Sequence, residues 1–255
     1  MNKNWFKLVF LFSVVSLCWS PIASAGQDFR KKLIELDAFH PPVPGDAKNH
    51  LYKEWHYFTM TSKTGDFTFS TIFTMEGDTN DVTKSYALKI ENYQTSVKSD
   101  LTLDIFPIDA ATWFSDKPDY YLDKNSISYD GKAYQIHTES ADGKVVFDAK
   151  WKPVLKPEKA VSLPMKSSDT TTSHVMNWLI ASAQLEVEGR LVVEKGTASE
   201  KVYQFKDARG YHDHNWGYWD WADNFGWDWG QAVEKEGPAC KSKIGRWKDS
   251  CKKQK

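Results

Sequence analysis

Apolar and polar residues alternate with a period of two along much of this chain. From Glu54 onward, one face of the predicted strand carries Trp55, Tyr57 and Thr59, and the other carries His56, Phe58 and Met60. Residues 62–66 have turn composition, and the alternation resumes over residues 67–73. Because side chains point to opposite faces of a strand in turn, this pattern predicts a β-hairpin.

Three further segments carry the same signal. Residues 126–129 and 133–137 flank the turn dipeptide Asp130-Gly131, and residues 145–151 follow Asp142-Gly143. Residues 184–193 alternate, turn near Lys195-Gly196 and return through residues 202–205. Helices are expected only over residues 30–36 and 174–183. So many strands with so few helices predict an all-β protein that forms a closed or nearly closed antiparallel barrel.

The first residues have the composition of an export signal. Lys3 and Lys7 precede an apolar run over residues 8–19. Ala23-Ser24-Ala25 follows this run. A run of this length is short for a membrane span, so residues 1–25 are predicted to be a signal peptide cleaved after Ala25. Leu17 stands before Cys18 where a lipoprotein needs a small residue. We therefore expect a periplasmic or secreted protein whose membrane association is at most peripheral.

Charge and cysteine content narrow the partners. Loss of Lys3 and Lys7 with the signal peptide leaves 31 basic and 34 acidic residues, a formal charge of −3. This balance argues against a nucleic-acid partner. Residues 234–255 are basic and aperiodic, as a solvated tail would be. Cys240 and Cys251 lie in this tail, and whether they pair is left open.

The densest chemistry lies in Gly210-Tyr211-His212-Asp213-His214-Asn215-Trp216-Gly217. On a strand, Tyr211, Asp213 and Asn215 would share one face, and His212, His214 and Trp216 the other. Buried polar groups need partners, so a run that mixes acid, imidazole and indole groups is costly as mere packing. The motif is therefore a candidate site.

Asp213 is the candidate acid of this site. Burial among aromatic rings raises the pKa of a carboxyl group, so Asp213 can keep a proton near neutral pH and donate it. Aromatic faces also stabilise a cation, as protonation of an alkene requires. The candidate catalytic residues are Asp213, Tyr211, His212 and His214. The candidate residues for binding an apolar ligand, an isoprenoid or lipid if the family resemblance described below holds, are Trp216, Trp55, Tyr57, Trp219 and Trp229.

Other interpretations stay open. The acid and the imidazoles can form a purely structural hydrogen-bond network, and the barrel can be a non-catalytic carrier of an apolar ligand. The His212-x-His214 spacing also suits two metal ligands, with a third among Asp220, Asp223, His56, His137 and His174. Glu54 is either a second acid or a charge at the start of a strand. Motifs for serine hydrolases, phosphate loops and zinc proteases are missing, and no metal or other cofactor is expected.

The central motif resembles the signature of the carotenoid 1,2-hydratases (hydroxyneurosporene synthases), within the AttH-like group of lipocalin-related proteins. Residues 54–58, Glu-Trp-His-Tyr-Phe, are similar to the Glu-Trp-Trp-Tyr opening of that family, with His56 in place of the second Trp. Residues 226–230, Gly-Trp-Asp-Trp-Gly, resemble the strand that follows the signature. The resemblance covers about residues 51–232.

This resemblance implies a lipocalin-like barrel over residues 26–233. It also implies cofactor-independent addition of water to a terminal isoprenoid double bond, with Asp213 delivering the proton. Members of the family usually have two such halves with the ligand cavity between them, so we expect this chain to correspond to the first half. Residues 234–255 would then be a truncated or frame-shifted second domain. A half with an open sheet edge would also favour a homodimer.

Overall fold

The computed structural model describes residues 32–78, 81–96, 98–165 and 174–221. These residues all belong to one compact unit, Met1–Asn224. The predicted signal peptide, the tail with its two cysteines, Asp223 and Trp229 lie outside the described residues. None of the described helices is long and apolar enough to cross a bilayer.

The described chain is almost entirely antiparallel β-structure, as predicted. A short helix covers residues 32–37. Two 3-10 helices follow, η1 (Asn49–Leu51) and η2 (Ile108–Ala110). The strands are β1 (Tyr52–Thr61), β2 (Phe67–Gly77), β3 (Ser85–Thr95), β4 (Ser99–Pro107), β5 (Ala111–Trp113), β6 (Tyr120–Leu122), β7 (Asn125–Tyr129), β8 (Tyr134–Glu139), β9 (Val146–Pro153), β10 (Val161–Met165), β11 (His174–Val193) and β12 (Lys201–Tyr218).

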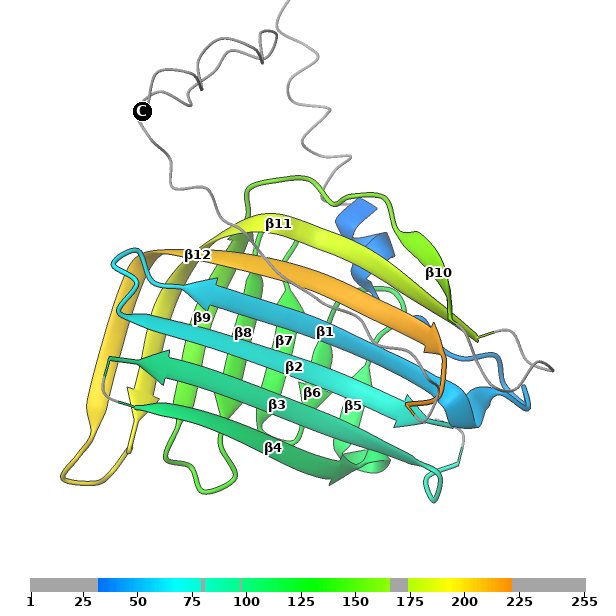
Figure 1. Cartoon of the computed structure of the whole chain (residues 1–255), viewed down its shortest axis with the longest axis horizontal. Coiled ribbons are helices and arrows are strands. Elements are labelled where there is room, and N and C mark those ends of the chain that lie inside the picture. Colours follow the sequence, from blue (N-terminus) through cyan, green and yellow to red (C-terminus); the bar gives the residue numbers. More distant parts are fainter. Residues whose placement is uncertain (1–31, 79–80, 97, 166–173, 222–255) are drawn as a thin grey trace, which may run out of the picture. The chain divides into compact units, whose positions relative to one another are not determined.

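One sheet curls into a nearly closed, lipocalin-like barrel. Its strand order is β4-β3-β2-β1-β12-β11-β9-β8-β7-β6-β5, and β10 pairs with β11 outside this path. Figure 1 shows β1 to β4 and β12 running side by side, with β5 to β9 behind them. Strands β4 and β5 are the two ends of this order, so the barrel keeps an open seam between the edges of the sheet.

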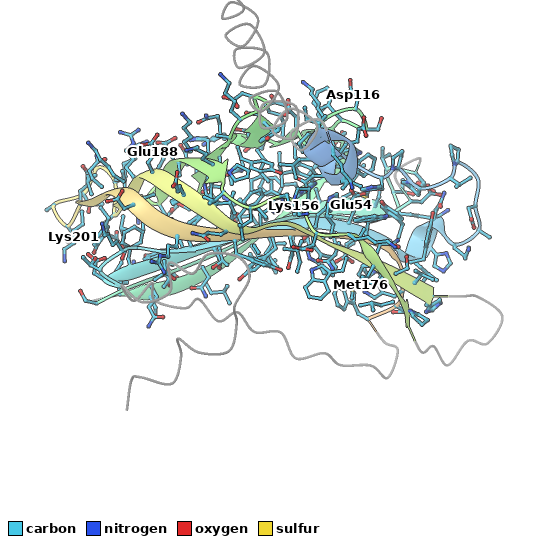
Figure 2. All side chains as sticks on the ribbon, turned by 90° about the horizontal axis from the view of Figure 1, so that it is seen from above. Glu54, Asp116, Lys156, Met176, Glu188 and Lys201 are labelled. Atoms are coloured by element: carbon cyan, nitrogen blue, oxygen red, sulfur yellow. The ribbon has the colours of Figure 1, made fainter. Side chains whose placement is uncertain are left out.

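Stacked aromatic rings fill the interior. The rings of Phe69 and Phe147 lie 3.7 Å apart and parallel to within 6°. Phe58 packs edge-on against Trp151, with 5.5 Å between ring centroids. These side chains are buried, and they come from opposite walls of the barrel. Figure 2 shows side chains filling the space between the walls, with Glu54 labelled on one of them.

The predicted helix over residues 174–183 is wrong, because this segment is the first half of β11. Its backbone pairs with β12 from Val175 opposite Tyr218 to Ile180 opposite Asp213. On its other side, residues 174–178 pair with β10. The helix over residues 30–36 is confirmed within the described residues, where it covers residues 32–37.

Candidate functional site

Strand β12 carries the central motif between two neighbours. Residues 209–218 pair with β1, and most of the same stretch also pairs with β11. Asp213 lies opposite Tyr57 of β1 and Ile180 of β11. The motif thus occupies the middle of the sheet, where its backbone is held on both sides.

A glycine at each end lets the neighbouring chains approach the motif closely. A Cβ atom on Gly210 would lie 2.7 Å from the Trp151 ring. Gly217 has a φ of +146°, and a Cβ there would lie 2.0 Å from the Val175 carbonyl oxygen. Both positions therefore require glycine.

The two faces of β12 carry different chemistry. The predicted alternation holds, since Tyr211 and Asp213 meet on the outer face while His212 and His214 point into the barrel and are fully buried. Sheet geometry thus separates the four candidate catalytic residues into two pairs. The imidazoles do not touch the Asp213 carboxyl group, although their charges act on it through the strand.

On the outer face, Asp213 is a nearly buried acid, with 3% of its surface exposed. The Tyr211 hydroxyl donates a hydrogen bond to its carboxyl group at 2.9 Å, and the Trp178 side chain also hydrogen-bonds it. Burial raises the pKa of Asp213 to about 6, against the lowering effect of these two donors. The pKa of Asp213 therefore lies within about one unit of neutral pH, so a fraction of the carboxyl groups is still protonated there.

Aromatic side chains surround this acid. Tyr57 lies directly opposite Asp213 on β1, and its ring is 6.4 Å from that of Tyr211. Trp55, two residues before Tyr57, packs edge-on against buried Trp219 at 5.3 Å and lies over Trp221 at 6.1 Å. Three of the predicted substrate-binding residues, Trp55, Tyr57 and Trp219, are therefore on this side of the sheet.

Trp216 lies elsewhere. Its side chain is on the inner face, where its ring stacks on that of His40 with 3.8 Å between centroids and an interplanar angle of 2°. Because Trp216 and Asp213 are on opposite faces of the same strand, Trp216 cannot line the wall beside Asp213. It packs against His40 of the inner network instead.

The inner face holds a buried network of carboxylates and imidazoles. Asp37, at the end of the first helix, bonds the His212 ring at 2.9 Å and accepts from the Tyr134 hydroxyl at 2.6 Å. Glu54 bonds the other imidazole, His214, at 2.7 Å. Its carboxylate also accepts from the Tyr52 hydroxyl and from the His40 amide. Glu54 is thus neither an isolated charge nor in contact with Asp213.

Carboxylates and imidazoles shift one another's pKa values within this network. Burial opposes protonation of His214, but its bonds to Asp37 and Glu54 outweigh burial and raise its pKa to about 9. Burial would raise the pKa of Glu54, yet bonds from His214 and His40 lower it to about 2. Burial and the nearby His214 charge hold the pKa of His56 well below its usual value, so this ring is neutral. His214 is therefore protonated at neutral pH and forms ion pairs with Asp37 and Glu54.

Two groups of these donors lie close enough to share one ion. Asp37, His56 and His212 form the first group, and His40, Glu54 and His214 form the second, each with ligand atoms within 4.8 Å of one another. The predicted pair, His212 and His214, is divided between the two groups. A metal would have to replace the protons that now join these residues. Elemental analysis of the purified protein tests for it.

The other histidines considered as ligands lie apart from this network. His137 bonds Asp148 at 2.6 Å on the barrel surface, where about a third of each side chain is exposed. His174 is buried at the start of β11. Neither belongs to a described group of donors that could hold an ion.

Sequence reasoning missed Asp37, His40 and Tyr134. The first two lie just after the predicted helix, in a segment whose side-chain contacts with β1 and β12 have no periodic signal. A usable hint was the acid of Leu36-Asp37-Ala38-Phe39, which interrupts an apolar stretch. Tyr134 fits the alternation of β8 and was not distinguishable from core.

Comparisons with known proteins give distant matches in structure alone. No protein-family model matches the chain, and neither does any curated protein. A candidate AttH protein of Nitrosomonas europaea is 14% identical with a TM-score of 0.46, over 71% of this chain and 58% of that one. Kievitone hydratase of Nectria haematococca is 11% identical with a TM-score of 0.43, over 73% and 56%. CghA is 13% identical with a TM-score of 0.36, over 71% and 53%.

The chain spans less than two thirds of the length of each of these proteins. The matches thus include an AttH-like protein and a hydratase. They are too distant to transfer a substrate or a catalytic residue to this chain.

Proposed function

We propose that this protein is a cofactor-independent hydratase, a lyase that adds water to a carbon-carbon double bond of an isoprenoid or another lipid. The observation that carries the proposal is the Asp213 carboxyl group, which is buried beside aromatic rings with its pKa raised to about 6. A carboxyl group in this state is a general acid matched to neutral pH. We further propose that the protein is exported and works without a metal.

The proposed reaction needs one proton and one water. Asp213 gives its proton to one alkene carbon, and the π electrons form the new C–H bond, which leaves a cation on the other carbon. Tyr57, Tyr211 and Trp55 are placed to stabilise that cation through their π faces, by up to about 2 kcal/mol for each desolvated contact. Water then bonds to the cation and returns a proton to the Asp213 carboxylate. If a neighbouring C–H proton leaves instead, the product is an isomer.

The rival function is a carrier that binds an apolar ligand without turnover. A lipocalin-type carrier holds its ligand inside the barrel. Here the interior is occupied by aromatic stacks and by the network around Asp37 and His212. The outer face with Asp213 is therefore the better candidate for ligand contact.

Isotope incorporation distinguishes the functions. A bacterial neutral-lipid extract is incubated in D2O enriched in oxygen-18, with the mature protein or with Asp213→Asn, and analysed by high-resolution mass spectrometry. A hydratase incorporates both deuterium and oxygen-18, an isomerase incorporates deuterium alone, and a carrier incorporates neither. Asp207→Asn, on the same strand but exposed, is the control and should behave as wild type. Incorporation that persists in Asp213→Asn would refute the proposed acid.

A further inference from the structure

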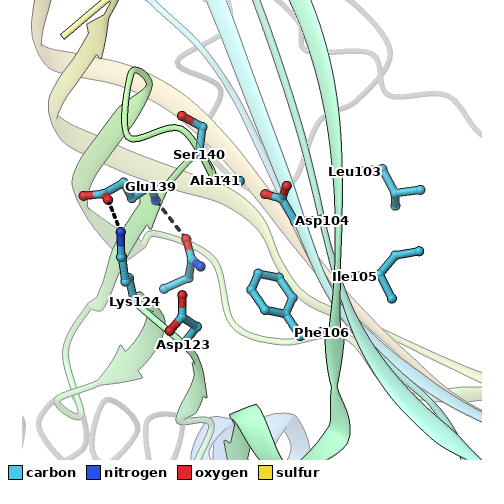
Figure 3. Close-up of a pocket in the computed structure, with 10 residues that line it drawn as sticks. Leu103, Asp104, Ile105, Phe106, Asp123, Lys124, Glu139, Ser140 and Ala141 are labelled. Atoms are coloured by element: carbon cyan, nitrogen blue, oxygen red, sulfur yellow. Dashed lines mark hydrogen bonds and ion pairs between the residues drawn. The ribbon is translucent and has the colours of Figure 1, made fainter.

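Strand β4 presents three large aliphatic side chains to solvent. Leu101, Leu103 and Ile105 are 67%, 56% and 67% exposed. Figure 3 shows Leu103 and Ile105 pointing away from β4 on one side, while Asp104 and Phe106 point toward a hollow on the other. Single exposed aliphatics are ordinary, but three at alternate positions of one strand form a continuous apolar strip.

This strip lies on an open edge of the sheet. Strand β4 is the last in the strand order, and it pairs on one side with β3. That pairing runs without a bulge from Tyr86 opposite Pro107 to Gln94 opposite Ser99. Soluble proteins usually protect such an edge with charged side chains, a bulge or an internal proline. Strand β4 has no lysine, bulge or internal proline, and of its two acids Asp104 is paired with buried Lys89 at 3.3 Å. Among the described residues, no strand pairs with the other edge of β4.

On the same outer face, the apolar strip continues from the edge strand β4 onto β3 and β2. Leu103 lies opposite Ile90 of β3, and Ile90 lies opposite Ile72 of β2. Both isoleucines are half-buried. The exposed apolar surface thus extends over neighbouring strands, which favours a partner that covers the outer face as well as the edge.

We propose that β4 pairs with β4 of a second copy of this chain, antiparallel and around a two-fold axis at Leu103. Three registers place at least two of the three aliphatic side chains of each strand opposite aliphatic side chains of the partner, with the axis at Thr102, Leu103 or Asp104. An axis at Thr102 would place Asp100 opposite the partner's Asp104. An axis at Asp104 would place the two copies of that residue directly opposite each other. Like charges in these positions are destabilising.

The axis at Leu103 avoids both clashes. Leu101 then lies opposite the partner's Ile105, and the two Leu103 side chains meet at the centre. Asp100 faces the partner's Phe106, and Asp104 faces the partner's Thr102. The charge pattern of β4 therefore selects one self-complementary register, and the interface closes on itself as a two-fold dimer does. The strand has two acids and no base, so it would be repelled by an anionic membrane.

Charge-swap variants test this interface. The mass of the mature chain is measured by sedimentation equilibrium at micromolar concentrations. Wild type should be a dimer, and Leu103→Asp should be a monomer because it brings two acids together at the axis. Leu103→Lys alone should also be monomeric, and an equimolar mixture of the two variants should restore a dimer. Val202→Asp, at a residue 50% exposed on β12, should leave the dimer intact.

Circular dichroism shows whether each variant keeps the wild-type β-sheet spectrum. A monomeric wild type would overturn the proposal. A dimer that persists in well-folded Leu103→Asp would also overturn it, because the interface would then lie elsewhere. Failure of the mixed variants to pair would contradict the axis at Leu103.

Discussion

Three buried carboxyl groups in this barrel differ in their pKa because their partners differ. Asp37 and Glu54 face imidazoles, whose charges and hydrogen bonds overcome burial and lower both pKa values. Asp213 has a phenol and an indole as donors, and burial dominates. At the residue scale, the face of β12 on which an acid lies decides whether it is an ion-pair partner or a proton donor.

Tyr211 should tune the proton donor. Its hydrogen bond favours the charged form of Asp213, so Tyr211→Phe should raise the Asp213 pKa above about 6. The pH above which the rate of isotope incorporation falls should then be higher than in wild type. Tyr203→Phe, on the same strand, is the matched control and should leave the profile unchanged. A profile that moves to lower pH in Tyr211→Phe would contradict this role.

His214 should make stability depend on pH. Its folded pKa of about 9 lies above the ordinary value of 6.5, so its contribution is complete below pH 6.5 and is lost as pH rises through 9. The free energy of unfolding, measured by urea titration, should fall on the order of 3 kcal/mol across this window. Asp213 adds a separate fall at lower pH, because its contribution is complete below pH 3.8 and is lost as pH rises through about 6.

Variants separate the two contributions. Asp213→Asn should retain the fall between pH 6.5 and 9, and His214→Gln should lose most of it. If His214→Gln keeps the wild-type dependence, His214 is not the group that titrates.

At the element scale, the hairpin β11–β12 organises both faces of the site. The alternation over residues 184–193 and 202–205 predicted its distal part and the faces of the motif. The first half of β11 was misassigned because Met176, Leu179, Ile180 and Ala183 also have the spacing of one face of a helix. Pairing with β10 and β12 makes this segment a strand, and local sequence patterns do not predict such long-range pairing. The contact of Asp37 with His212 spans 175 residues and is equally invisible to local patterns.

Gly210 is the packing point of this hairpin. An added methyl group would lie 2.7 Å from both the Trp151 ring and a Val187 methyl group, which are held in the core. Gly210→Ala should destabilise the protein by about 1–3 kcal/mol through overpacking. Thermal unfolding measures this effect, and Gly196→Ala, with open space around the Cβ position but a φ of +75°, separates backbone strain from crowding. A Gly210→Ala variant as stable as wild type would contradict crowding by Trp151.

At the scale of the whole molecule, the barrel closes through side chains where its sheet does not. Lys89 of β3 is fully buried, and its ammonium group donates to Asn125 of β7 at 3.1 Å. It also pairs with Glu91 at 2.9 Å and Asp104 at 3.3 Å. The number of strands predicted a barrel. The position of the seam could not be predicted, because it depends on which strands become the edges of the sheet.

Removing this cation should open the seam. Lys89→Met would leave two acids without their cation and should cost about 3–5 kcal/mol of unfolding free energy. The exposed pair of Lys152 and Glu186, 3.1 Å apart, is the matched control, and Lys152→Met should cost less than about 1 kcal/mol. Urea titration of both variants at neutral pH measures the difference. Comparable costs would mean that Lys89 does not hold the seam.

The most direct test of the account is a titration of the Asp213 carboxyl group itself. Infrared difference spectra between wild type and Asp213→Asn isolate the band of its protonated form across a pH series. We expect this band to disappear with a pKa of about 6. A midpoint near the ordinary aspartate value of 3.8 would contradict it, because Asp213 would then have no proton to give at neutral pH.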